Sequence, residues 1–283
     1  MTHFRARARR WLFPVAVVVF AVLVVAPACG GEAAAENAPE AAIERAIVYF
    51  GRDVSTADPN WAALFAFLKR RFGLEVRLAS GEFAHRVRGG AAGGVMQDIY
   101  RRIDDPTAIA DKKAIADLEH VVDRITASAL HCDRIALPAD WLAILAKAAQ
   151  AGGYALTHSA LALEWTLENG CAPRHAAEVA ALRLEQVRLL VALMDDRAEL
   201  ARRFEADADL WIEAVAMLYY VGGRAEIRPE WLRHLVGMQL PNGAWPASTR
   251  AERADAHATS LALWALLEAT REPTSGPWIV PSS

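Results

Sequence analysis

Several patterns that would point directly to an activity are missing from the 283 residues of this chain. It contains neither the G-x-S-x-G elbow of serine hydrolases nor the H-E-x-x-H helix of zinc proteases. Basic and acidic residues nearly balance, 31 against 34, so the chain has no basic footprint and we expect no nucleic-acid partner. No segment alternates apolar and polar residues with the two-residue period of a strand. We therefore expect a helical protein whose reaction, if it has one, uses none of these motifs.

The charge balance conceals a difference between the N-terminus and the rest of the chain. Residues 1–28 hold four arginines and no acidic residue, which leaves a net charge near −7 on the remainder. The arginines precede an apolar stretch from Leu12 to Ala26, and Ala26-Pro27-Ala28 supplies small residues after it. These are the three parts of a secretory signal peptide. The alternative is an uncleaved membrane anchor, because the 18 residues from Trp11 to Ala28 reach the lower limit for spanning a bilayer.

Cys29 follows this segment directly and resembles the lipidated cysteine of a bacterial lipoprotein, although Ala26 stands where such proteins usually have leucine. Residues 29–42 are rich in Gly, Ala and Glu and lack an apolar face, which is typical of a flexible tether. We therefore expect an extracytoplasmic protein. It is either a lipoprotein anchored to the membrane, in the periplasm or at the cell surface, or a secreted protein.

The chain has only three cysteines, and if Cys29 carries a lipid then Cys132 and Cys171 remain as a pair. In an oxidising compartment such a pair can form a disulfide. Closing a loop of about 40 residues would stabilise the fold by about 3–4 kcal/mol in the chain-entropy model. Two separate buried thiols are the alternative.

Residues 43–272 are predicted to form one all-α domain, and residues 273–283 form a C-terminal tail. Apolar residues recur at three- and four-residue spacing, which is typical of amphipathic helices. The first segments with this spacing are 43–54, 61–78 and 111–130. The glycine-rich residues 88–94 are predicted to be a loop, because they lack the Gly-Lys-Ser/Thr ending of a phosphate-binding loop.

From residue 138 onward the sequence repeats a two-helix unit. In residues 141–167 a Trp-Leu helix leads through glycines to a histidine and an apolar helix, and residues 231–266 repeat this order. Between them, residues 174–201 are amphipathic, whereas residues 207–221 are apolar on almost every side. A helix that is apolar all round is surrounded by protein. Alternating outer and inner helices predict an α/α toroid, with parallel inner helices in a ring.

One motif in this repeat resembles a known family. Gln239-Leu-Pro-Asn-Gly243-Ala-Trp245 is similar to the Q-x-x-x-G-x-W repeat of terpene cyclase and prenyltransferase toroids, where it braces the turn from an outer to an inner helix. The acidic protonating motif of the cyclases is missing, since Asp104-Asp105 is followed by Pro106 in a predicted loop. The zinc ligands of the prenyltransferases find no match either. The resemblance therefore implies the fold and neither of those reactions.

The chain after the signal segment also resembles an uncharacterised secreted helical family that includes a vertebrate member. That resemblance implies secretion and a helical fold, and it carries no activity. The matching stretches are Glu44-Arg45-Ala46, Gly153 to His158, Asn169-Gly170-Cys171, Asp209 to Glu213, Trp231 to Gln239, and His257 with Thr259.

Polar side chains are expected to converge where the predicted inner helices begin. His158, Asp209 and His257 fall in the first turns of three such helices, and Glu213 lies one turn beyond Asp209 on the same face. If the inner helices are parallel, these four residues meet at one mouth of the toroid. The predicted N-caps of the three helices are Thr157, Asp207 and Asp255.

Two imidazoles and two carboxyl groups allow two kinds of chemistry. His158, Glu213 and His257 could bind zinc or another divalent metal with water in an open position. The four residues could equally form a catalytic acid/base pair without a metal. Each also has a structural explanation, since Asp209 favours the positive end of its helix and a histidine can bond a backbone carbonyl. Glu213 is the hardest to explain structurally, because a carboxylate in so apolar a helix needs a partner.

The sequence thus supports two functions and leaves open whether the protein is an enzyme. The simpler one is a module that binds a small molecule, a lipid-like ligand or a protein partner, because no recognised catalytic motif is present. The alternative is an extracytoplasmic hydrolase or lyase, metal-dependent or acid/base, with its site at the toroid mouth.

Overall fold

The computed structural model describes residues 38–52, 59–75, 95–103, 105, 107–171, 176–195, 208–248 and 253–274. Within these residues the chain is mostly helical, as the sequence predicts. The elements are α2 (Ala38–Arg52), α3 (Pro59–Phe72), α5 (Val95–Tyr100), η1 (Arg101–Ile103), α6 (Lys112–Ala116), α7 (Val121–Leu130), α8 (Trp141–Ala151), α9 (Gly153–Glu168), α10 (Ala176–Asp195), α12 (Ala208–Tyr220), η2 (Arg224–Glu226), α13 (Pro229–Gly237), β1 (Trp245–Pro246), β2 (Ala254–Asp255) and α14 (Ala256–Thr270).

Five helices, α3, α7, α9, α12 and α14, run in the same direction. Near their N-terminal ends, Tyr154 of α9 and His257 of α14 both bond the carboxylate of Asp209 at the start of α12. At the opposite end, Arg71 near the end of α3 bonds Glu268 near the end of α14. Side chains near the N-terminus of one helix therefore contact side chains near the N-termini of neighbouring helices.

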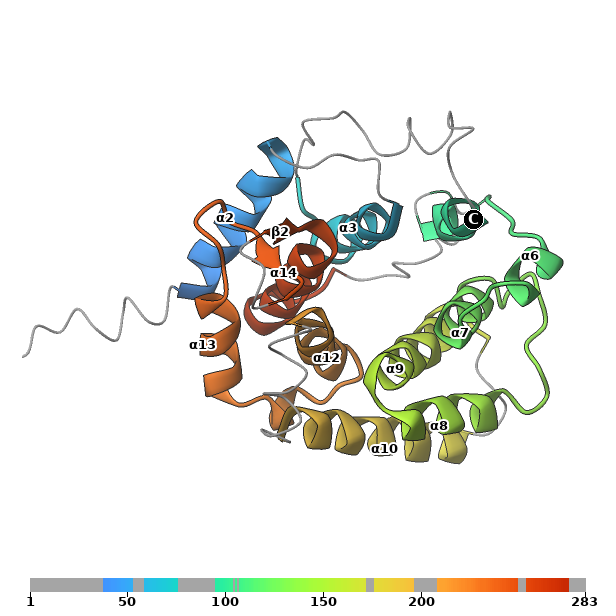
Figure 1. Cartoon of the computed structure of the whole chain (residues 1–283). Coiled ribbons are helices and arrows are strands. Elements are labelled where there is room, and N and C mark those ends of the chain that lie inside the picture. Colours follow the sequence, from blue (N-terminus) through green and yellow to red (C-terminus); the bar gives the residue numbers. More distant parts are fainter. Residues whose placement is uncertain are drawn as a thin grey trace, which may run out of the picture. The chain divides into compact units, whose positions relative to one another are not determined.

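The remaining long helices cover the outside of this parallel group. In Figure 1, α13, α10 and α8 follow one another along the outer side of α14, α12 and α9, and α2 lies beside α13 and α14. The sequence of α10 suits this place, because its buried residues recur every three or four positions while Leu184 is 71% exposed.

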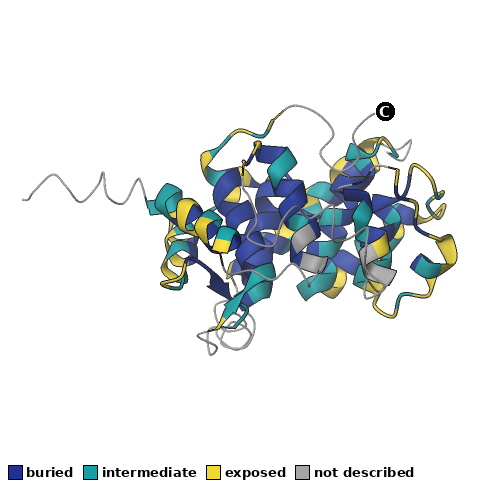
Figure 2. Ribbon diagram, turned by 90° about the horizontal axis from the view of Figure 1, so that it is seen from above, coloured by how far each residue is buried: buried dark blue, intermediate teal, exposed yellow. Residues whose placement is uncertain are grey.

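The two innermost helices are buried on nearly every side. Every residue of α12 except Asp209 is buried, and α14 is buried without interruption from Ala258 to Glu268. In Figure 2 the buried residues, in dark blue, gather on the helices in the middle of the molecule. Their all-round apolar sequences predicted this. Burial of a large apolar side chain contributes about 1.5–3 kcal/mol, so these two helices form the centre of the hydrophobic core.

The Q-x-x-x-G-x-W motif ties the turn after α13 to α2, the first helix among the described residues. The Gln239 amide donates to the carbonyl oxygens of Ala42 at 2.8 Å and Gly243 at 2.9 Å. Gly243 has φ +92°, and a Cβ there would lie 2.3 Å from the carbonyl oxygen of Arg45 in α2. Trp245 is fully buried, and its indole N–H donates to the Leu235 carbonyl at 2.7 Å. The motif thus joins helices that are far apart in sequence.

The structure differs from the sequence predictions at several element boundaries. Trp245–Pro246 and Ala254–Asp255 pair as a short antiparallel sheet, although no strand was expected, because two residues are too few to show alternation. The predicted helix 111–130 is broken after Ala116, where Asp117 acts as a C-cap. Helix α2 begins at Ala38, inside the predicted tether, because Pro39 is tolerated in a first helical turn.

The predicted N-caps have mixed outcomes. Asp255 is the N-cap of α14, and its carboxylate accepts from the Ala258 N–H. Thr157 is not an N-cap, because α9 already begins at Gly153 and Thr157 lies inside the helix. Several features named above lie outside the described residues: the signal segment 1–28, Cys29, the glycine-rich segment 88–94, Asp207 and most of the C-terminal tail.

Candidate functional site

A cavity of about 440 Å³ opens between the N-terminal ends of the parallel helices. Its lining side chains come from all five of these helices, together with residues of the α5 region and His120. The lining residues are Ala63, Leu64, Phe67, Tyr100, Ile103, His120, Val122, Asp123, Thr126, Tyr154, His158, Leu161, Trp165, Glu213, Met217, His257, Leu261 and Trp264.

The cavity is polar at one end and apolar at the other, as helical spacing requires. Glu213 is followed one turn later by Met217, and His257 by Leu261. Because positions i and i+4 share a face, each helix presents a polar group first and an apolar group deeper in the same cavity. Trp264 lies deeper still. We call the N-terminal, polar end of the cavity its mouth.

His257 is held at the mouth by a carboxylate behind it. Its Nδ1 lies 3.0 Å from Asp209 Oδ1, and the Tyr154 hydroxyl donates to the other oxygen of Asp209 at 3.1 Å. Burial lowers the pKa of His257, but the hydrogen bond and charge of Asp209, with the charges of Glu213 and Asp255, raise that pKa overall to about 9. His257 is therefore an imidazolium at neutral pH, and its side chain lines the cavity.

His158 has the opposite character although it lines the same cavity. Burial lowers its pKa to about 4, against the nearby charge of Asp123, and the positive charge of His257 lowers it further. At neutral pH the ring is therefore uncharged. One imidazole at the mouth is neutral while its neighbour is protonated, and such a separation of pKa values is typical of acid/base pairs.

Thr126 connects His158 to the backbone of α7. Its hydroxyl oxygen lies 2.7 Å from the Val122 carbonyl oxygen and 3.0 Å from His158 Nδ1. A hydroxyl has one hydrogen to donate, so the direction of the contact with Nδ1 depends on the tautomer of His158. If Thr126 donates to Val122, the neutral ring carries its hydrogen on Nδ1.

Three of the four predicted site residues line the cavity together. His158, Glu213 and His257 do so, and His158 Nε2 lies 3.5 Å from Glu213 Oε1. Asp209 lies behind His257 and is not a lining residue. His158 lies in the second turn of α9 rather than the first, because that helix begins at Gly153.

Sequence reasoning missed several polar residues of the site, among them Tyr100, His120, Tyr154, Asp123 and Thr126. Tyr154 precedes His158 by four residues, so its helical spacing could have identified it. Asp123 and Thr126 lie on α7, whose apolar face alone was recognised from the sequence. No local feature indicates that α7 packs beside α9, so these two residues required the tertiary structure.

The predicted zinc site finds no assembled donor set. No group of three or more His, Cys, Asp or Glu side chains among the described residues is placed so that it could hold a metal ion. His257 Nδ1 instead lies 3.0 Å from Asp209 Oδ1, and His158 Nδ1 lies 3.0 Å from the Thr126 hydroxyl.

A second buried polar cluster lies near the C-terminal ends of α3 and α14, at the end opposite the mouth of the cavity. Arg71 Nε donates to Glu268 Oε1 at 2.6 Å, and Trp264 Nε1 donates to the same oxygen at 2.9 Å. The Arg71 guanidinium also lies over the Tyr220 ring, 5.0 Å from its centre. Burial raises the pKa of neighbouring Glu168 to about 7, against the opposing effects of its hydrogen bond to Tyr220 and the charge of Arg71. These contacts hold Trp264 in place as the cavity floor.

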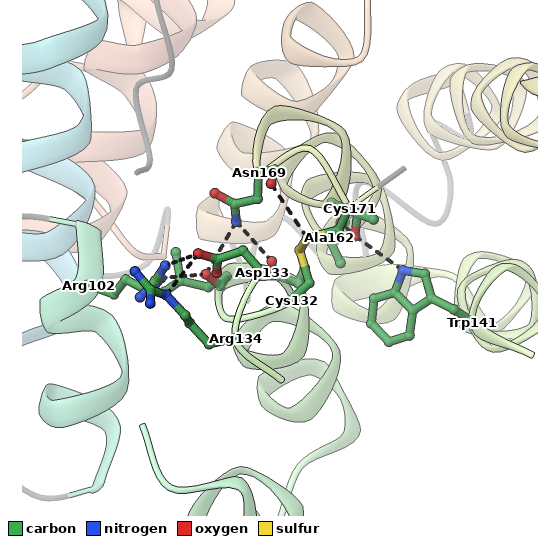
Figure 3. The surroundings of a disulfide bond; sticks show 11 residues. Arg102, Cys132, Asp133, Arg134, Trp141, Ala162, Asn169 and Cys171 are labelled. Atoms are coloured by element: carbon green, nitrogen blue, oxygen red, sulfur yellow. Dashed lines mark hydrogen bonds and ion pairs between the residues drawn. A yellow bond between two sulfur atoms is a disulfide. The ribbon is translucent and has the colours of Figure 1, made fainter. Parts of the chain in front are cut away.

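Cys132 and Cys171 form a disulfide, with their Cα atoms 6.0 Å apart. It joins the residues that follow α7 and α9 (Figure 3). Beside it, Asn169 donates to the carbonyl oxygens of Ala129 at 3.0 Å and Leu130 at 3.2 Å. These contacts fix α7, which carries Asp123 and Thr126, against α9, which carries His158.

No protein-family model, curated protein or solved structure matches this chain. The resemblance to the cyclase toroids and to the secreted family therefore remains a prediction from the sequence.

Proposed function

We propose that this protein is a ligand-binding module whose cavity takes a small amphipathic molecule. The observation that carries the proposal is the division of one cavity into a polar mouth and an apolar, aromatic interior. Ligand pockets of this kind are mostly apolar, with a few placed polar groups that orient the ligand. The apolar body would contact Trp165, Met217 and Trp264, and the polar head would lie beside His158 and His257.

The proposed architecture is an α/α toroid with the cavity inside its ring. Two observations support it: the shared direction of α3, α7, α9, α12 and α14, and the order of α8, α10 and α13 outside them. The Gln239 contact between the last outer helix and α2 is the kind of contact that would close such a ring.

The proposed location is extracytoplasmic, with a lipid on Cys29 or an uncleaved N-terminal segment as the membrane contact, or with release as a secreted protein. Within the described residues, no helix is long and apolar enough to cross a membrane. A Cys29→Ser variant distinguishes the two anchors. If lipidation holds the protein, the variant is found in the soluble fraction; if it stays in the membrane fraction, the lipid is not the anchor.

Calorimetric titration of the purified chain with three eight-carbon probes tests the binding function. The probes are n-octylamine and octan-1-ol, which share an eight-carbon alkyl chain, and octanoate, whose alkyl chain is one methylene shorter. We expect at least one of them to bind, and we expect Leu161→Trp, which fills the cavity, to abolish that binding. The matched control is Leu184→Trp, because Leu184 is 71% exposed on α10. Absence of binding by all three probes, or equal binding by both tryptophan variants, would overturn the proposal.

A second candidate function is an acid/base hydrolase or lyase, and the specific observation in its favour is the neutral His158 beside the protonated His257. General acid–base catalysis contributes about 10²–10⁴-fold in rate. If the pair hydrolyses amphipathic esters, p-nitrophenyl octanoate is turned over and His158→Asn loses at least about 100-fold of that rate. Equal rates for His158→Asn and the unaltered chain would exclude this function for that substrate class.

A further inference from the structure

We infer that the ligand of this cavity carries an aromatic ring, which enters the deep end of the cavity while the polar head stays at the mouth. This inference rests on the proposed binding function and names the chemical class of the ligand's apolar body. It follows from the order in which side chains line the cavity and from the arrangement of the deepest rings.

The lining side chains change in kind with depth. One helical turn beyond the polar mouth they are aliphatic or carry a thioether: Leu161, Met217 and Leu261. Trp165 of α9 and Trp264 of α14 line the cavity one turn further along their helices. Because α9 and α14 run in the same direction, the two indoles lie at a similar depth. An aromatic layer therefore follows the aliphatic one.

Each of these indoles forms a nearly perpendicular pair with another ring of the lining. The ring centres of Phe67 and Trp264 are 5.0 Å apart, and the angle between their planes is 67°. The ring centres of Tyr100 and Trp165 are 6.5 Å apart, with an angle of 69°. All four rings line the cavity, and they come from four elements, α3, α14, α5 and α9. We call these four side chains the aromatic end of the cavity.

The perpendicular pairs offer a bound ring two kinds of aromatic contact. An aromatic ring is electron-rich over its face and electron-poor at its edge, so rings prefer offset stacked or edge-to-face contacts. A planar ring stacked on one member of such a pair is nearly perpendicular to the other member, so it can make both contacts at once. A saturated chain or ring lacks this electron distribution and gains only from the burial of its apolar surface.

The aromatic end is held in place by side chains behind it. Trp264 Nε1 donates to Glu268 Oε1 at 2.9 Å, and the ring centres of Trp264 and Tyr220 are 4.9 Å apart. The Arg71 guanidinium lies 5.0 Å from the centre of the Tyr220 ring and 6.0 Å from that of Phe67. A site whose walls are fixed in this way favours a rigid planar group, because a flexible chain loses more conformational freedom on binding.

Two alcohols, 2-phenylethanol and 2-cyclohexylethanol, test the ring. They share the head group and the number of carbon atoms, but the saturated ring is the more hydrophobic. Burial alone would therefore favour 2-cyclohexylethanol. We expect calorimetric titration to show that 2-phenylethanol binds at least about threefold more tightly. Equal affinities, or tighter binding of 2-cyclohexylethanol, would overturn the inference.

The variant Phe67→Leu removes one ring of the aromatic end and keeps an apolar side chain. We expect it to weaken the binding of 2-phenylethanol at least about threefold while changing that of 2-cyclohexylethanol less than about twofold. Phe65→Leu is the matched control, because Phe65 lies on the same helix, is also 1% exposed and is not a lining residue. Should Phe67→Leu not fold, Tyr100→Leu at a partly exposed position provides the same test. Equal weakening of both alcohols would contradict the role given to the rings.

Failure of this inference differs from failure of the binding function. If an octyl probe binds in the cavity and 2-phenylethanol does not, the aromatic class is overturned while the cavity remains a binding site. If neither ring alcohol and none of the octyl probes binds, the binding function fails, and the inference fails with it.

Discussion

At the scale of single residues, the mouth of the cavity holds two histidines with opposite behaviour. The cause is their partners rather than their depth. His257 contacts a carboxylate that Tyr154 fixes in place, whereas His158 contacts the neutral hydroxyl of Thr126. A carboxylate partner favours the imidazolium, and burial against neutral groups favours the uncharged ring.

The raised pKa of His257 predicts a stability change with a definite sign. In the unfolded chain histidine has a pKa near 6.5, while the folded value is about 9. The folded state therefore holds the proton more tightly, so this stabilisation is complete below pH 6.5 and is lost as the pH rises to 9. We expect the melting temperature of the unaltered chain to exceed that of His257→Gln at pH 6 and this difference to shrink by pH 9.5. A difference that stays constant with pH would contradict the assignment. When Asp209→Asn is also present in both proteins, the difference between them at pH 6 should be smaller, because this substitution removes the carboxylate partner of His257.

The contact between His158 and Thr126 makes the tautomer of His158 a testable property. If Thr126 donates its hydrogen to Val122, ¹⁵N shifts should show a neutral ring protonated at Nδ1, persisting until the pH falls to about 4. Thr126→Val should release this preference, because valine accepts no hydrogen bond. Observation of the Nε2–H tautomer would show that Thr126 donates to His158 instead, and titration near pH 6.5 would contradict the lowered pKa.

At the scale of elements, the turn after α13 depends on one glycine. Gly243 has a positive φ, and a Cβ would meet the Arg45 backbone of α2. We expect Gly243→Ala to lower the free energy of unfolding by more than about 1 kcal/mol, measured by denaturant titration. Gly237→Ala is the matched control in the same region, because a Cβ at Gly237 meets nothing within 4 Å. That substitution should be neutral or stabilising by up to about 1 kcal/mol. Equal losses from both would remove the special role of Gly243.

The disulfide after α7 and α9 predicts a second effect at this scale. Cys132 and Cys171 are 39 residues apart, and a loop of that length stabilises the folded state by about 3–4 kcal/mol in the chain-entropy model. The double variant Cys132→Ser/Cys171→Ser should lose about that amount in denaturant unfolding under oxidising conditions. If the unaltered chain and the double variant unfold at the same denaturant concentration, the bond contributes nothing to stability.

At the scale of the whole molecule, apolar patterning predicted the class of fold well. The apolar sequence of residues 207–221 identified a helix that is buried on almost every side, and the apolar helix at the end of the repeat 231–266 is buried as well. Breaks within helices were harder to predict, since the end of α6 at Ala116 depends on a local cap at Asp117 rather than on periodicity.

Part of the candidate site could be predicted from local sequence, and the rest depends on tertiary packing. His158, Glu213 and His257 could be predicted to converge, because a shared helix direction brings helix starts together. The protonation of His158 and His257 could not be predicted, because it depends on burial and on charges such as that of Asp123, which packing alone brings to the site.

The central claim is that the cavity between the parallel helices is the ligand site. A crystal structure of the chain with n-octylamine tests it most directly. We expect electron density for the alkyl chain beside Trp165 and Trp264, with the nitrogen at the polar mouth of the cavity. Density for the probe only on the outer surface, with the cavity holding none of it, would contradict the account.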